Sequence, residues 1–79
     1  MVRLDNISTA GGVASCRFYP ENSEMYGKLT IDITSGEIIE LTEPDGGCPK
    51  TYIAHARSKL HKLSVNNEKM PDEAFAIWY

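Results

Sequence analysis

The segment Lys28–Thr34 constrains the fold most strongly, because polar and apolar residues alternate along it without interruption. Leu29, Ile31 and Ile33 all fall on one side of an extended segment with this pattern. Alternation with a period of two is typical of a β-strand that is buried on one face only. The segment therefore predicts a strand that packs against another layer on the side of these three residues.

The residues after this strand predict a hairpin whose second strand runs from Glu37 to Glu43. A loop of three residues, 34–36, brings apolar residues of the two strands opposite each other. The expected pairs are Ile31 with Ile39 and Leu29 with Leu41. Such a loop needs a left-handed residue at its third position, and Gly36 adopts that conformation at no steric cost. We therefore expect the three-residue loop.

A helix is expected between Pro49 and Ser64. Pro49 suits the first turn of a helix, where its missing N–H group costs nothing. The apolar residues of the segment fall within roughly 100° of arc, so they form one face of an amphipathic helix. These residues are Tyr52, Ile53, Ala56, Leu60 and Leu63.

Two more strands are expected before the hairpin, at residues 2–7 and 13–19, and one at the end of the sequence, at residues 74–79. The order of elements predicts an α+β fold (ββββαβ): an antiparallel meander of about four strands, one amphipathic helix packed on one face, and a C-terminal strand. With 79 residues, of which 42% are apolar and 24% charged, the composition is that of one globular domain spanning residues 1–79.

The last expected strand has apolar residues on both of its sides, which is typical of a strand that is covered on both faces. One helix covers only one face of a sheet, so the other face is left for a partner. We therefore expect an apolar interaction surface that includes Trp78 and Tyr79 of this strand and Ile38 of the hairpin. Val13 and Tyr19 are expected on the same face. The alternative is that the end of the chain is frayed.

Charge is divided between the hairpin and the helix. Residues 21–45 carry seven carboxylates and one lysine, whereas residues 46–67 carry four basic residues, two histidines and no acid. Carboxylates on the outer sides of the hairpin strands predict a second contact surface for a protein partner with a basic groove. These residues are Asp32, Glu37, Glu40 and Glu43, of which Glu37, expected opposite Ile33, is the one that departs from the division into apolar and charged sides.

These patterns favour a small, acidic, non-catalytic protein-interaction module that acts as an inhibitor or regulator. Proteins of phages and mobile elements are among the regulators of this description. A homodimer is the simplest form of such an interaction. The net charge of −3 argues against direct nucleic-acid binding, although the basic residues of the helix offer it as an alternative. No apolar run is long enough to span a membrane and no secretion signal is present, so we expect a cytoplasmic protein.

A thiol-dependent enzyme is the other alternative, because Cys48 precedes the expected helix, whose N-terminus favours a thiolate. The nearest histidine in sequence, His55, lies seven residues further on, which is roughly 10 Å along a helix. The two cysteines and two histidines show neither Cys-x-x-Cys nor His-x-x-x-His spacing. We therefore expect no catalytic residues, no metal site and no cofactor.

Overall fold

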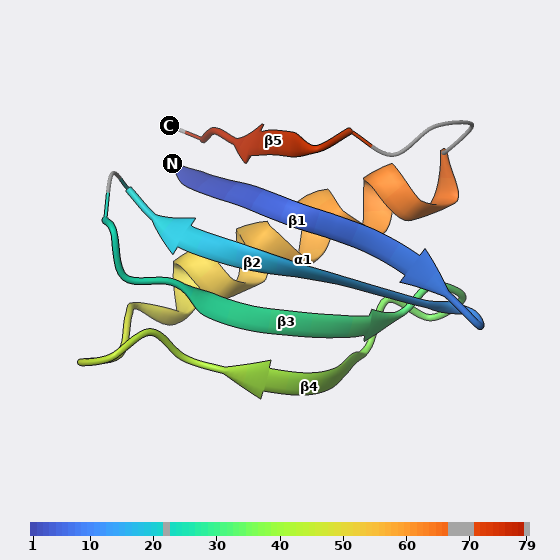
Figure 1. The fold of residues 1–79 in the computed structure, drawn as a ribbon, viewed down its shortest axis with the longest axis horizontal. Coiled ribbons are helices and arrows are strands. Elements are labelled where there is room, and N and C mark those ends of the chain that lie inside the picture. The colour runs from blue at the N-terminus through green and yellow to red at the C-terminus, as the bar shows by residue number, and fades with distance from the viewer. Residues whose placement is uncertain (22, 67–70, 79) are drawn as a thin grey trace.

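A computed structural model of the chain describes residues 1–21, 23–66 and 71–78. Within these residues, one five-stranded antiparallel sheet carries one helix on a single face (Figure 1). The elements are β1 (Val2–Ala10), β2 (Val13–Pro20), β3 (Gly27–Asp32), β4 (Ile38–Thr42), α1 (Lys50–Val65) and β5 (Glu73–Ala76). The predicted α+β fold with the order ββββαβ is confirmed.

The strands lie in the order β4-β3-β2-β1-β5. Strands β1 to β4 form a meander, and β5 returns beside β1 after α1 has crossed the sheet. Because β1 is antiparallel to both β2 and β5, and β3 is antiparallel to both β2 and β4, strands β4 and β5 run in the same direction. They form the two opposite edges of the sheet (Figure 1).

The core lies between α1 and one face of the sheet. Strands β1 to β3 direct alternate side chains toward the helix, and α1 contributes Ile53, Ala56 and Leu60. The largest fully buried side chains are Phe18, Leu4, Leu29, Ile31, Leu60 and Val2. Helix α1 packs mainly on β1 and β2 and less on β5 and β3, so β4 lies at the margin of the covered face.

The β3–β4 hairpin keeps only one of its two predicted pairs. Leu29 lies opposite Leu41, as predicted. Ile31, however, lies opposite Ile38 rather than Ile39, because the register shifts and Ile39 is an extra residue on β4. The predicted register of Ile31 is therefore wrong. Ile38 consequently lies on the helix side of the sheet and not on its other face.

The turn explains this shift. The Asp32 carboxylate accepts hydrogen bonds from the backbone N–H groups of Thr34, at 2.8 Å, and Ser35, at 3.2 Å. The backbone N–H of Asp32 donates to the carbonyl oxygen of Glu37 at 2.9 Å. The loop therefore has four residues and not the predicted three, because a short aspartate side chain competes with the strand ladder for the N–H groups of the turn.

Helix α1 holds this turn against the body of the protein. The Arg57 guanidinium donates to the carbonyl oxygen of Gly36 at 3.3 Å, and His61 Nε2 lies 3.0 Å from the carbonyl oxygen of Ile33. Gly36 has a φ of 77°, the left-handed conformation predicted for it. Part of the basic helix thus contacts the hairpin of its own chain.

The C-terminal strand is shorter than expected and lies at an edge. Strand β5 ends at Ala76, which pairs with Val2 of β1. The expectation that both apolar sides of this strand are covered is not met within the described residues, because β5 is an edge strand beside β1. Ile77 follows the strand and is 63% exposed. Tyr79 lies outside the described residues.

Candidate functional site

Strand β4 is exposed along its whole length although three of its five residues are aliphatic. Ile38, Ile39 and Leu41 are 39%, 52% and 40% exposed. In the part of the chain that the structure describes, β4 pairs only with β3, so the backbone groups on its outer side have no strand beside them. Edge strands of this kind are normally short, charged or covered, because they invite pairing with another chain.

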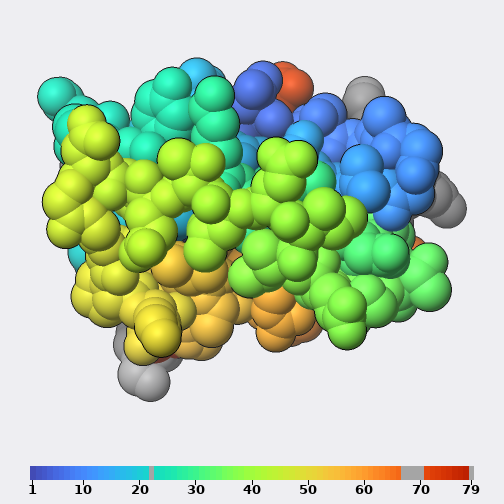
Figure 2. Space-filling view, turned by 90° about the horizontal axis from the view of Figure 1, so that it is seen from below, coloured from blue at the N-terminus to red at the C-terminus, as the bar shows by residue number. Residues whose placement is uncertain are grey.

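Three exposed carboxylates accompany these aliphatic residues. Glu40 lies within β4, and Glu37 and Glu43 flank it. We call the outer side of Ile38–Thr42, together with Glu37 and Glu43, the β4 edge. Figure 2 shows the β4 hairpin and the segment that follows it, in green and yellow, spread across one side of the molecule. The edge thus combines apolar area with negative charge.

Asp32, the fourth carboxylate predicted to contact a partner, lies at the turn and accepts the two backbone hydrogen bonds described above. Its role in the turn accounts for its position in the sequence. A partner contact of Asp32 stays a prediction, and we do not include it in the β4 edge.

Trp78 follows β5 and therefore lies near the edge of the sheet opposite the β4 edge. Its ring stacks on His55 of α1, with centroids 3.9 Å apart and planes 6° apart. Tyr52 contacts it edge-on, with centroids 5.4 Å apart. Because β4 and β5 are the two edges of the sheet, the structure does not bring Trp78 together with Ile38. The single apolar surface that was predicted to contain both is therefore not formed.

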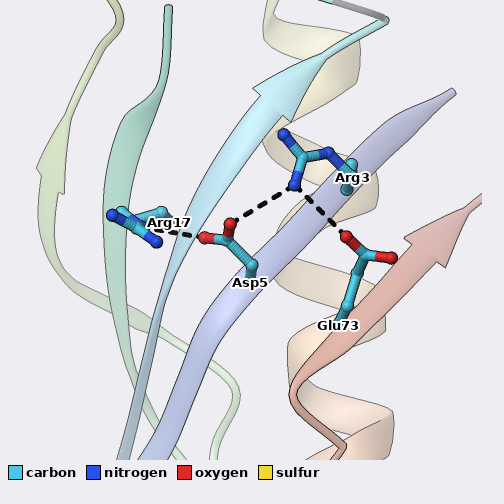
Figure 3. Close-up of polar contacts among 4 residues, drawn as sticks. All are labelled: Arg3, Asp5, Arg17 and Glu73. Atoms are coloured by element: carbon cyan, nitrogen blue, oxygen red, sulfur yellow. Dashed lines mark hydrogen bonds and ion pairs between the residues drawn. The ribbon is translucent and has the colours of Figure 1, made fainter. Parts of the chain in front are cut away.

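The sheet face opposite α1, here called the open face, carries a network of charged residues that the sequence analysis missed (Figure 3). Asp5 accepts a bond of 2.8 Å from Arg17 Nε and one of 3.3 Å from Arg3 Nη1. Arg3 also bonds to Glu73 at 3.3 Å and lies over the ring of Tyr19, 3.9 Å from its centroid. The charged side chains at this point of the open face are thus paired with one another.

The signal for this network was present only as alternation within strands. Arg3 and Asp5 are two residues apart, as are Arg17 and Tyr19, so each pair projects from one face. Nothing in the sequence shows that β5, which carries Glu73, lies beside these strands. Tyr19 does lie on the open face, as predicted, but it is buried there by its neighbours.

Neither cysteine has the properties of an activated thiol. Partial burial and the Glu43 carboxylate raise the pKa of Cys48. Burial and the nearby Asp5 raise the pKa of Cys16 to about 12. Both effects favour the neutral thiol, whereas a nucleophilic cysteine needs a lowered pKa.

Among the residues described, no three His, Cys, Asp or Glu side chains gather in a way that could hold a metal ion. No helix in the described ranges is long and apolar enough to cross a membrane. Comparisons of the chain with protein-family models, with curated proteins and with solved structures returned no significant match.

Proposed function

We propose that this protein is a small non-catalytic interaction module. Its β4 edge binds a basic surface on a protein partner. The observation that carries the proposal is the exposure of all five β4 residues, three of them aliphatic, at an edge that no other described strand pairs with. Apolar area removed from water contributes about 25 cal/mol per Å². A partner strand added to such an edge also gains main-chain hydrogen bonds.

The carboxylates determine the sign of the partner's charge. Glu37, Glu40 and Glu43 surround the aliphatic residues, Lys28 is the one basic residue within the hairpin strands, and Arg57 of α1 contacts the turn. Opposite charge on a partner speeds the encounter and selects against wrong partners. A basic groove that normally takes a polyanion has this chemistry, which agrees with a role as an inhibitor or regulator.

Pairing of two β4 strands is opposed by the same carboxylates. In the symmetric antiparallel register that pairs all five residues, Glu40 lies opposite Glu40 of the second copy, and Glu37 lies opposite Glu43. Like charges directly opposite each other destabilise a strand pair. A symmetric dimer through two β4 edges is therefore not the interaction that we propose.

The two alternatives have less support. A thiol enzyme at Cys48 needs a lowered pKa, and the pKa of this thiol is raised. Nucleic-acid binding by α1 needs a continuous basic surface. Arg57, however, is bonded to the hairpin turn, and Lys50 lies at the first position of the helix, away from the other basic residues.

The proposal is tested with two short synthetic peptides, one alternating lysine with valine and one alternating glutamate with valine. We expect the lysine peptide alone to bind, with the largest changes in NMR amide shifts along β4. Glu40→Lys should weaken this binding about tenfold by replacing attraction with repulsion. Ile39→Thr should weaken it less, by removing apolar area.

Asp72→Lys is the matched control, because it makes the same charge change at the far edge of the sheet. This variant should bind the lysine peptide nearly as well as the wild-type protein does. Equal binding of both peptides, or amide shifts that spare β4, would contradict the proposal.

A further inference from the structure

A groove of about 330 Å³ lies between α1 and β5, at the edge of the sheet opposite β4. Three side chains of α1 that carry or can accept a positive charge line it: His55, Lys59 and Lys62. The other wall is formed by residues 75–77 of β5 and the segment after it, of which Ile77 is 63% exposed. Among the described residues that line it there is no carboxylate. We call this the α1–β5 groove.

The α1–β5 groove and the β4 edge are complementary in chemistry. The edge presents three aliphatic side chains and three carboxylates, and the groove presents exposed Ile77 with two lysines and a histidine. Each lies beside an edge strand whose outer side is unpaired within the described residues. One chain thus carries an acidic surface and a basic surface at the two opposite edges of the same sheet.

Strand direction also fits. Strands β4 and β5 run in the same direction (Figure 1). The β4 of one copy can therefore lie parallel to the β5 of the next, which puts both helices on the same face of a continuous sheet. Parallel pairing is slightly weaker per residue than antiparallel pairing, so the charged side chains matter more.

The same geometry orders the charges along the contact. The stack between His55 and Trp78 places His55 at the end of the groove where β5 finishes, and Lys62 lies further along α1, toward the start of β5. In the parallel arrangement, Glu37, just before β4, therefore lies at the Lys62 end. Glu43, just after β4, lies at the His55 end.

From these observations we infer that the basic partner of the β4 edge is the α1–β5 groove of a second copy of this chain. The inference rests on the proposed function, because it uses the same edge. The contact joins two different surfaces, so it leaves one edge and one groove free and leads to a ring or an open chain of copies.

The test is sedimentation equilibrium of the full chain at increasing protein concentration and at low and high salt. The wild-type protein should assemble beyond a dimer, and salt should weaken the assembly. Glu37→Lys and Lys62→Glu should each weaken association about tenfold. The double variant, Glu37→Lys with Lys62→Glu, should recover most of the association, because attraction is restored with the charges exchanged.

Lys50→Glu is the control, since it makes the same charge change on α1 outside the groove and should leave association unchanged. Lys59→Glu provides a second groove variant if Lys62→Glu reduces the helix content measured by circular dichroism. A dimer that Glu37→Lys strengthens would overturn the inference, because it would mean that two acidic edges meet.

A wild-type protein that stays monomeric at every concentration would also overturn it. If such a monomer still binds the lysine peptide along β4, the proposed function stands and only the inference fails. If it binds no peptide, both fail.

Discussion

His55 and Trp78 stack face to face, with ring centroids 3.9 Å apart and an angle of 6° between their planes. This contact fixes the residues after β5 against α1, and Tyr52 completes it from the side. Trp78 packs against the core and is only half-exposed. In this structure it stabilises the fold at the edge opposite β4.

Replacing Trp78 should therefore affect stability and not peptide binding. We expect Trp78→Ala to lower the free energy of unfolding by about 1–3 kcal/mol, because a half-buried aromatic contact is lost. Urea denaturation measures this change, and titration with the lysine peptide provides the comparison. Loss of peptide binding without loss of stability would assign Trp78 to the contact surface.

Tyr52 should control the ionisation of Glu21. The Tyr52 hydroxyl donates to Glu21 Oε1 at 2.7 Å, and the N-terminal amine lies 3.1 Å from the same oxygen. These contacts, the tyrosine first, lower the pKa of Glu21. Tyr52→Phe should raise this pKa toward its ordinary value, which an NMR titration of the carboxyl group measures.

The effect on stability has a defined sign. A carboxyl group whose pKa is lower in the folded state stabilises the fold above its unfolded pKa, and this contribution is lost as the pH falls through the folded pKa. The stability difference between wild type and Tyr52→Phe that arises from this ionisation should therefore be present at neutral pH and vanish in acid. An unchanged Glu21 titration in the variant would refute the assignment.

Alkylation should separate the two cysteines. Because the pKa values of both thiols are raised, we expect both to react with iodoacetamide more slowly in the folded protein than in urea. Cys16, which is buried, should be the slower of the two. Mass spectrometry of each site gives the rates. Faster reaction of Cys48 in the folded state would revive the thiol-enzyme alternative.

The predictable parts of the fold come from local patterns. Alternation over Lys28–Thr34 predicts β3, and the apolar arc of residues 49–64 predicts α1, because both patterns are set by burial on one side of a regular element. The hairpin register was mispredicted because the Asp32 carboxylate takes two N–H groups of the turn. Only side-chain geometry decides that competition.

The candidate surface was predictable only in part. The carboxylates Glu37, Glu40 and Glu43 are exposed in β4 or next to its ends, as expected from their charge. Strand β5 pairs with β1 at an edge of the sheet. These two segments are far apart in the sequence, and no local pattern specifies the contact between them. The separation of Trp78 from Ile38 follows from that position.

The pairing of Val2 with Ala76 closes a loop that contains strands β2 to β4 and helix α1. Strands β1 to β4 and α1 can form in the order in which they are synthesised, but the outer side of β1 stays open until β5 arrives. Contacts that close such a long loop form late, and until then an unpaired strand can join another chain. A nascent or truncated chain that lacks the last residues therefore exposes β1, in place of β5, as the second edge strand of the sheet.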